Sequence, residues 1–351
     1  MSPFRRRISR GMAKDRVLGV DIGAHSIKIA EVDFSGERPE VTGYTAVALP
    51  FGSIEDGLVA IDKRKFIVDA LKHAVNSGVF STKNAVLGFN SPNAAFMHTL
   101  TIGAMSEEDI EKSKVLLIEA ADLGIDTAHQ QIDFSVLGRR PRGNKIDVQF
   151  YYIQDDVAET ICQIAEDAGL ELVGADLGML AALRGAAIDL HGHGAQAVVN
   201  IGADTITVVV HHNGVPLYAF GDTVFAGNEA SRLIADALTR DPDDPEVETY
   251  KRAGQWDYST SQVVAEYASN LADRIVNALG AYTRSTPDAP KVESILLTGG
   301  GSLLVGLAKV IQTKANIRVQ YAAADTSSFA GDLQHATLHL TAIGLTTGAQ
   351  S

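Results

Sequence analysis

The chain has 351 residues, a net charge of −13 at pH 7, 46% hydrophobic and 21% charged residues, and a single cysteine. This length suits two domains, and the composition is that of a packed globular protein rather than a disordered or fibrous one. The acidic balance excludes generic nucleic-acid binding, which needs a basic face. Cys162 has no second cysteine with which to form a disulfide or a zinc site. We therefore expect a reducing compartment such as the cytoplasm.

The first sixteen residues are strongly basic and show no apolar periodicity. A secretory signal would continue into an apolar core, whereas this chain continues into the strand-like segment Val17–Asp21. No run of 18 apolar residues follows, so we expect no membrane-spanning helix. We predict a flexible tail over residues 1–16, either solvated or in contact with an anionic membrane surface.

Two segments that lie 179 residues apart resemble each other. Residues 20–32 read VDIGAHSIKIAEV, and residues 199–211 read VNIGADTITVVVH. Each predicts an apolar strand, a glycine turn and a second strand rich in β-branched residues, so each half of the chain opens with a β-hairpin. A glycine turn next to a small hydroxyl residue offers N–H and O–H donors to a phosphate. We expect the two turns to hold one polyphosphate from both sides.

A third glycine-rich element follows the apolar strand predicted at 292–298. Three glycines, Gly299, Gly300 and Gly301, come directly after this strand, and the sequence predicts a helix from Leu303 to Ala315. Glycines permit close approach of a ligand to the backbone, and a helix start adds its positive dipole end. This element predicts a nucleoside-binding turn.

The segments LGVDIGAHSIKIAEV, AVVNIGADTITVVV and ILLTGGGSLLVGL resemble the phosphate-1, phosphate-2 and adenosine motifs of the actin, sugar-kinase and heat-shock-chaperone superfamily. Within it, the chain from Val17 to Gly348 resembles the PilM family of type IV pilus assembly proteins. Further similarities are the basic lead before the first motif, the acidic helix start Ser106–Asp109 and the AIGLTTGA tail. The resemblance implies an α/β, actin-like (ribonuclease H-like) duplicated two-domain fold with an inserted subdomain in the first half.

The resemblance also implies where the parts of the chain begin and end. The first half covers 17–195 with an insert at about 92–150, the second half covers 196–336, and a C-terminal helix within 337–351 returns to the first half. Inside the insert, the sequence predicts a strand at 94–102 and a helix from about 107 to 123, capped by Ser106 and Asp109 and ended by Gly124. Strands near 130–137 and 145–153 follow, separated by the basic turn Arg139–Gly143.

Carried over residue by residue, the resemblance implies a Mg-ATP site. It places the phosphates and the Mg²⁺ between the two hairpins, the adenosine at the three glycines, and the purine and ribose contacts on a helix. The residues are, in that order, Asp21, Gly23, Ala24 and Ser26; Asn200, Gly202, Asp204 and Thr205; Gly299, Gly300 and Gly301; and Glu248, Lys251 and Arg252. Asp21 and Asn200 would hold Mg²⁺ through water. The Glu-x-x-Lys spacing is also that of an ordinary surface pair. Asp176 either contacts metal-bound water or caps a helix from Leu177 to Ile188.

One position departs from the family pattern. The phosphate-2 motif normally has an aspartate where this chain has Asn200. A carboxylate orients magnesium waters and can assist an attacking water, whereas an amide keeps an oxygen but loses the charge. We therefore expect ATP binding with weak or absent hydrolysis, and we assign no catalytic residue.

Two other clusters are interpreted as structural. His191, His193, His211 and His212 lie close in sequence, but adjacent strand residues point to opposite faces, which argues against a metal site. The run Asp241–Glu246 contains two prolines and lacks the spacing of a calcium loop, so it predicts a solvated linker.

The function implied by the resemblance is that of a cytoplasmic, ATP-loaded scaffold at the inner face of the cytoplasmic membrane. Its expected partners are the short cytoplasmic N-terminal peptide of a PilN-like inner-membrane protein, held between the first-half core and the insert, and other pilus assembly platform proteins. Homo-oligomerisation stays open. A kinase of the same superfamily would need a strong aspartate near the phosphates, which Asn200 replaces. An FtsA-like division protein would be expected to end in an amphipathic helix, whereas the given sequence ends in TTGAQS.

Overall fold

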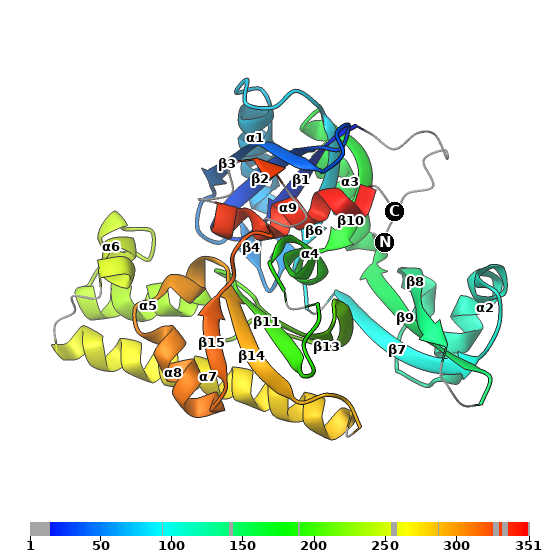
Figure 1. Cartoon of the computed structure of the whole chain (residues 1–351). Coiled ribbons are helices and arrows are strands. Elements are labelled where there is room, and N and C mark those ends of the chain that lie inside the picture. Colours follow the sequence, from blue (N-terminus) through cyan, green and yellow to red (C-terminus); the bar gives the residue numbers. More distant parts are fainter. Residues whose placement is uncertain are drawn as a thin grey trace.

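The computed structural model describes residues 15–92, 94–139, 143–188, 190–253, 258–286, 288–325, 330–331 and 336–349. Two sheets organise the molecule (Figure 1). The first has the order β10-β6-β1-β2-β3-β16, and the second has the order β13-β12-β11-β14-β15. The strands of the first sheet are β1 (Arg16–Ile22), β2 (Ser26–Asp33), β3 (Glu40–Ala48), β6 (Asn84–Phe89), β10 (Glu171–Leu177) and β16 (Ala330–Gly331). Those of the second are β11 (Ala195–Ile201), β12 (Ile206–His212), β13 (Val215–Asp222), β14 (Val292–Thr298) and β15 (Arg318–Tyr321).

The two sheets repeat one topology. In each, three consecutive strands form an antiparallel meander, and two later strands add in parallel beside the first strand of the meander. The repeat extends to the register, because Val20 pairs with Ile29 and Val199 pairs with Val208. Both pairs are related by the 179-residue offset, so the two predicted hairpins are confirmed.

Helices cover both faces of the first sheet, which explains why β1 and β2 are apolar along almost their whole length (Figure 1). Leu18 belongs to a core cluster with Ile67 of α1, whereas Val17 belongs to one with Ala181 of α4 and Leu345 of α9. The helices are α1 (Arg64–Val75), α3 (Asp155–Asp167), α4 (Gly178–Gly185) and α9 (Leu340–Thr346). The second sheet packs with α5 (Gly227–Leu238), α6 (Pro245–Ala253), α7 (Tyr258–Ser285) and α8 (Leu307–Ala315).

Glycines let α4 and α9 pack in backbone contact between the two sheets. A Cβ on Gly344 of α9 would lie 1.9 Å from the Ala181 carbonyl oxygen of α4, and one on Gly185 would lie 2.0 Å from the Leu340 carbonyl oxygen. The chain passes from β10 of the first half through α4 to β11 of the second half. The contact with α9 therefore joins this connection between the halves to the C-terminal helix.

The insert is a small sheet with its own core, and it projects from the first half on the side opposite α6 (Figure 1). Its strand order is β7-β9-β8, with β7 (Ala95–Gly103), β8 (Gln130–Arg139) and β9 (Lys145–Gln154), and α2 (Glu107–Ala120) covers it. The Ser106 hydroxyl accepts the Asp109 N–H at 3.1 Å, which confirms the predicted cap. Ala95 and Ile153, at the base of the insert, pack in the core of the first half.

Several sequence-based boundaries differ from the structure. The helix of the insert ends at Ala120, because Asp122 already adopts a left-handed φ of 49°. The helix predicted over 177–188 covers only Gly178–Gly185, since Ala186 leaves it to bridge Ala324. Three other segments also differ from the prediction. β1 begins at Arg16, which was assigned to the tail, and β16 at 330–331 joins the first sheet, although it was assigned to the second half. α6 begins at Pro245, within the predicted linker. Residues 1–14 of the predicted tail and 140–142 of the basic turn lie outside the described residues.

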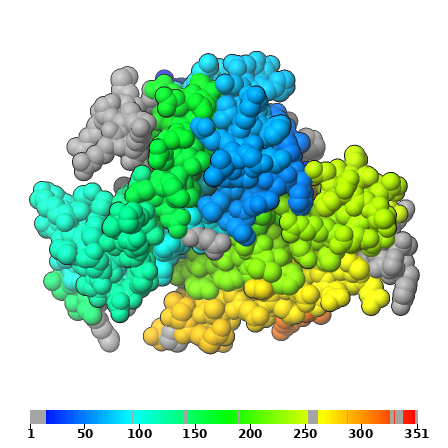
Figure 2. Space-filling model, turned by 180° about the vertical axis from the view of Figure 1, so that it is seen from behind, coloured from blue at the N-terminus to red at the C-terminus, as the bar shows by residue number. Residues whose placement is uncertain are grey.

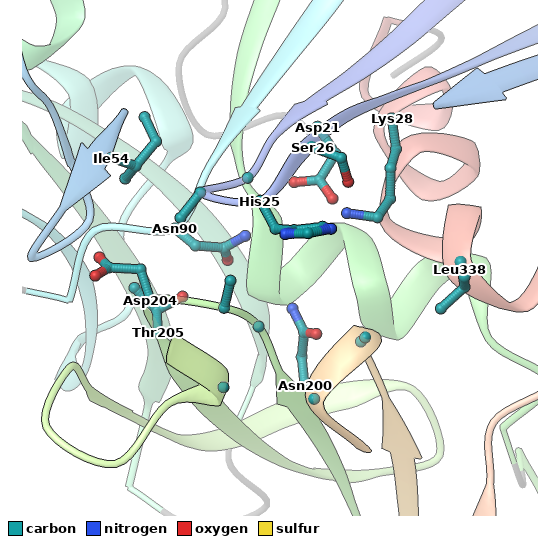
Figure 3. Close-up of a pocket in the computed structure, with 18 of the residues that line it drawn as sticks. Asp21, His25, Ser26, Lys28, Ile54, Asn90, Asn200, Asp204, Thr205 and Leu338 are labelled. Carbon is teal, nitrogen blue, oxygen red and sulfur yellow. The ribbon is translucent and has the colours of Figure 1, made fainter. Parts of the chain in front are cut away.

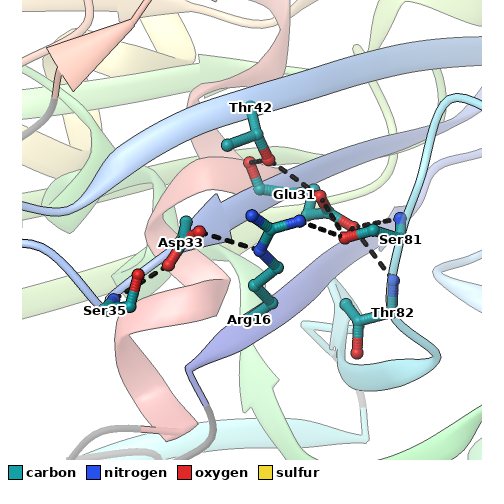
Figure 4. A network of polar contacts seen from close by, with 7 residues as sticks. All are labelled: Arg16, Glu31, Asp33, Ser35, Thr42, Ser81 and Thr82. Atoms are coloured by element: carbon teal, nitrogen blue, oxygen red, sulfur yellow. Dashed lines mark hydrogen bonds and ion pairs between the residues drawn. The ribbon is translucent and has the colours of Figure 1, made fainter.

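A buried carboxylate joins the start of β6 to the first hairpin (Figure 4). Glu31 of β2 is 2% exposed and accepts hydrogen bonds from the Thr42 hydroxyl at 2.8 Å and from the backbone N–H groups of Ser81 and Thr82 at 2.6 and 3.1 Å. Arg16 closes the network by donating to the Ser81 hydroxyl and to Asp33. Buried carboxylates need such partners, so this network fixes the register of the first hairpin against its neighbours.

No helix among the described residues is both long enough and apolar enough to cross a membrane.

Candidate functional site

A cavity of about 360 Å³ lies between the two sheets (Figure 3). Its walls are the turn between β1 and β2, the turn between β11 and β12, the glycines after β14, the starts of α5 and α9, and one side of α6. Because both duplicated turns face it, the cavity is built by the repeat itself. Its volume is within the range of sites for small molecules.

The sequence-predicted residues meet at this one cavity, with the exception of Arg252, whose side chain lies outside the described residues. The lining residues are Asp21, Gly23, Ala24, Ser26, Asn200, Gly202, Asp204, Thr205, Glu248, Lys251, Gly299, Gly300 and Gly301. The first and the last of these residues are more than 200 positions apart in the chain, so the fold brings together motifs that are distant in sequence.

The two turns share their local geometry. The N–H of Gly23 donates to the Ser26 carbonyl at 3.3 Å, and the N–H of Gly202 donates to the Thr205 carbonyl at 2.8 Å. The start of α5 braces the second turn, since the Asn228 N–H donates to the Ala203 carbonyl at 2.6 Å. Both turns are therefore held rigidly at the edges of the cavity.

Asp21 is the buried acid of the site. It is 7% exposed, and its Oδ1 has no hydrogen-bond partner among the described residues. Burial raises the pKa of its carboxyl group, while the charge of Lys28, its partner in the β1–β2 register, lowers it. A buried carboxylate oxygen without a partner is costly unless a ligand or cation satisfies it, so Asp21 is suited to a hydrated cation.

The glycines after β14 line the cavity and pack closely against the second hairpin. Gly299 has a φ of 84°, and a Cβ there would lie 2.3 Å from Asn200 Oδ1, so only glycine fits. A Cβ on Gly300 would meet no described atom within 4 Å. The expected helix start at this point is wrong. Gly300–Leu303 form a 3₁₀ turn, and α8 begins at Leu307 after Gly306, whose φ is 83°. α8 therefore begins after the last residue of this segment that lines the cavity, Gly301.

The predicted pair on α6 lines the opposite side of the cavity. Lys251 Nζ lies 3.4 Å from Glu248 Oε2 and donates to the Ser231 hydroxyl of α5 at 3.0 Å. The pair therefore joins α6 to α5 and presents a cation and an anion to the same space.

The lining residues that sequence reasoning missed include three cationic or imidazole side chains, His25, Lys28 and His339, and the amide of Asn90. Lys28 could have been found from strand alternation, because it faces Asp21 across the first hairpin. Asn90 follows β6, and His339 precedes α9, so only the sheet order brings them here. Asn90 Oδ1 and His339 Nδ1 are buried without hydrogen-bond partners among the described residues. Burial lowers the pKa of His339, and its hydrogen bond to the Thr45 carbonyl opposes that shift.

Two predicted roles do not hold. Asp176 is fully buried outside the cavity wall, where it pairs with Arg184 and accepts the Leu177 N–H, so it neither faces the cavity nor caps α4 through its side chain. Burial raises the pKa of Asp176, and Arg184 opposes that shift. No cluster of three His, Cys, Asp or Glu side chains suited to a metal ion occurs among the described residues.

The arrangement can hold a ligand that carries both phosphates and a planar base. The two turns bring the hydroxyl residues Ser26 and Thr205 to the cavity, and Lys28 supplies a cation. Asp21 and Asn90 each have a side-chain oxygen without a partner among the described residues, which suits a hydrated metal ion. Gly300 lines the cavity, and a Cβ there would meet no described atom within 4 Å, so this part of the cavity has room for a nucleoside.

Comparison with known proteins places the chain in a family. The family model "Type IV pilus assembly protein PilM" matches residues 19–347. The structure is similar to one described as the PilM-PilN type IV pilus biogenesis complex, at 19% identity and a TM-score of 0.81, covering 97% of this chain and 100% of that one.

Two other solved structures share the fold at lower similarity. The ethanolamine utilization protein EutJ from Carboxydothermus hydrogenoformans is 16% identical with a TM-score of 0.54, covering 98% of this chain and 92% of that one. MreB 5 of Spiroplasma citri bound to AMPPNP is 13% identical with a TM-score of 0.52, covering 94% and 95%. These likenesses confirm the predicted actin-like two-domain α/β fold. Because the family model spans nearly the whole length, the chain belongs to the PilM family of type IV pilus assembly proteins.

Proposed function

We propose that this PilM-family protein binds Mg-ATP in the cavity between its halves and holds the cytoplasmic N-terminal peptide of a PilN-like membrane protein at its insert. The observation that carries the first part is the meeting of both duplicated turns, Asp21 and the three glycines at one cavity. The second part is supported by the similarity to a structure described as a complex of PilM with PilN.

In this proposal the phosphates lie between the turns of Gly23 and Gly202, near Lys28, and the base lies against Gly299–Gly301. Asp21 and Asn200 hold Mg²⁺ through water, because both side chains line the cavity and Oδ1 of Asp21 has no other partner among the described residues. Mg²⁺ would neutralise phosphate charge, and it commonly keeps several waters in protein sites. Asn200 contributes no negative charge, which favours binding with slow hydrolysis.

The test of nucleotide binding is a thermal melt with and without Mg-ATP. A ligand that binds only the folded state adds RT ln(1 + [L]/Kd), about 2.7 kcal/mol at a hundredfold excess over Kd. The Gly300→Leu variant should abolish the shift, because Gly300 lines the cavity and a Cβ there meets no described atom within 4 Å, so the leucine side chain would occupy ligand space. The matched control is Gly103→Leu in the insert, where a Cβ also meets no described atom within 4 Å. No shift for the wild type, or an equal shift in Gly300→Leu, would contradict the site.

The insert supports the peptide part because each outer strand of its sheet has an edge without a strand partner among the described residues. Its order is β7-β9-β8, so both outer strands pair on one side only within the sheet. An extended peptide can add to such an edge through main-chain hydrogen bonds, with side-chain pockets giving specificity. A short peptide becomes ordered on binding, so we expect a micromolar Kd, about −8 kcal/mol.

A deletion that follows the strand register tests this part. Met97 and Tyr151 pair in the β7–β9 ladder, so residues 98–150 can be replaced by a two-residue Asn-Gly turn, with the base of the insert kept in the first-half core. Fluorescence anisotropy with a labelled N-terminal peptide of the cognate PilN-like protein should show saturable binding to the wild type and none to the deletion. The melting shift with Mg-ATP should persist in the deletion and serves as the folding control. Binding that survives the deletion would place the peptide elsewhere.

A further inference from the structure

A short hairpin of the first half reaches across to the second half at the edge of the cavity. Its strands β4 (Ile54–Glu55) and β5 (Leu58–Val59) pair through a two-residue turn, Asp56-Gly57, in which both residues have positive φ, 52° and 75°. Such a turn matches the twist of a hairpin and is rigid. We call residues 49–60, which contain this hairpin, the strap.

The backbone at the tip of the strap donates to a carboxylate of the second half, Asp204. The Gly57 N–H donates to Asp204 Oδ2 at 2.6 Å, although the two residues are 147 positions apart. Asp204 belongs to the turn between β11 and β12, one of the two turns that line the cavity. Figure 3 shows Asp204 and Ile54 of the strap on the same side of the cavity. The bond therefore joins the cavity wall of the first half to the cavity wall of the second half.

A second contact joins the strap to α5 of the second half. The guanidinium of Arg232 lies over the Phe51 ring, 5.5 Å from its centre. Seen from behind, the blue surface of the first half lies directly against the yellow-green surface of the second half (Figure 2). Phe51 and Arg232 do not line the cavity, so this contact can be changed without touching a bound ligand.

The strap packs against the core of the first half. Ile54 is 6% exposed in the first-half core, and Ser53 is fully buried, with its hydroxyl donating to the Pro50 carbonyl at 2.7 Å. A Cβ on Gly57 would lie 2.6 Å from the Asn90 carbonyl oxygen, so the tip rests on the chain that leaves β6. The strap is thus a firm part of the first half, and its fixation to the second half depends on Asp204 and Arg232.

The surroundings of Asp204 favour this role over that of a phosphate ligand. Its carboxylate faces the backbone N–H of the strap and lies near the like charges of Glu55 and Asp56. A carboxylate offers acceptors only and repels phosphate oxygens, whereas the N–H of Gly57 is a donor that it satisfies. Burial raises the pKa of Asp204, and the bond from Gly57 opposes that shift.

We propose that the strap is a latch between the two halves, that Asp204 is the positioning residue that fastens it, and that opening of the latch sets the rate of nucleotide release. Control of release rests on the proposed nucleotide binding. The latch and the role of Asp204 do not, because their contacts exist without a ligand.

The latch is tested first in the nucleotide-free protein by amide hydrogen exchange. Asp204→Ala removes the acceptor and should accelerate exchange of peptides covering residues 50–60 roughly ten-fold or more, the effect of losing a hydrogen bond to a charged group. Asp204→Asn keeps an oxygen acceptor and should stay close to the wild type. Peptides from β9 in the insert should not change. Unchanged exchange in Asp204→Ala, or equal acceleration in both variants, would overturn the role of Asp204.

The second measurement is the dissociation rate of a fluorescent ATP analogue after mixing with excess ATP. Phe51→Ala should release it about two- to five-fold faster, the size of an exposed cation–π contact. The matched control is Phe66→Ala, because Phe66 is half-exposed on α1 and carries a cation, Lys63, at 5.7 Å from within the same half. Equal rates for Phe51→Ala and wild type, or equal acceleration by Phe66→Ala, would overturn the release gate. Failure of the wild type to bind the analogue would refute the nucleotide proposal and the gate with it, while the exchange measurement still decides the latch.

Discussion

The packing of α4 against α9 makes a quantitative prediction for Gly344→Ala. Gly344 lies within α9, and a Cβ there would be 1.9 Å from the Ala181 carbonyl oxygen. Real Cβ contacts are essentially never shorter than 3.0 Å, so the two helices would have to separate by about 1.1 Å (3.0 − 1.9). Neither neighbour can relieve the clash by a side-chain rotation, because the opposing atom belongs to the backbone.

Two effects of opposite sign decide the magnitude. Alanine gains up to about 1 kcal/mol over glycine in a helix interior. Overpacking that shifts backbone typically costs about 1–3 kcal/mol and sometimes more. A separation of this size belongs at the upper end, so we expect a net loss of about 2 kcal/mol. For a chain of this length, that corresponds to a decrease in Tm of about 3 °C.

The assay is urea unfolding followed by circular dichroism, with Gly280→Ala as the control. Gly280 lies in the middle of α7, where a Cβ would meet only the end of the Arg284 side chain at 3.2 Å. Because that side chain can move away, the same substitution should stabilise the protein by up to about 1 kcal/mol. If Gly344→Ala were as stable as the wild type, or gained as much as Gly280→Ala, the close helix contact would not exist in solution.

Three more predictions concern charge. Burial raises the pKa of Asp133 in the folded insert to about 6, so the free energy of unfolding decreases as the pH rises from about 4 to about 6. Asp133→Asn should therefore add about 1–2 kcal/mol to the free energy of unfolding at pH 7.5 and nothing at pH 4, as measured by thermal melts at both pH values. We expect the wild type to hydrolyse ATP at less than about 1 per second, measured by phosphate release, and Asn200→Asp to hydrolyse it faster. An unchanged rate would mean that the missing negative charge does not limit hydrolysis. Glu31→Leu should cost at least about 3 kcal/mol in urea unfolding, since it leaves the donors of Thr42, Ser81 and Thr82 unpaired; a loss below about 1 kcal/mol would contradict the network.

The sequence by itself determined the duplicated framework and most of the cavity wall. Strand alternation, turn glycines and the 179-residue repeat predict both hairpins, and the observed pairs Val20–Ile29 and Val199–Val208 follow from them. The cap at Ser106 was also readable, because a cap is formed by residues three positions apart. These features depend on contacts between near neighbours in the chain, which residue order records directly.

Only the tertiary structure decided how distant segments meet. Asn90 and His339 reach the cavity through the order of the strands and the return of α9, and the Gly57–Asp204 bond spans 147 positions. The tertiary structure also decided where α8 begins. The glycines after β14 turn tightly beside Ile201 and Gly202 of the second hairpin, and the chain then needs a left-handed residue, Gly306, before a helix can begin. Local pattern could not reveal these arrangements, because each depends on the shape of a surface formed by another part of the chain.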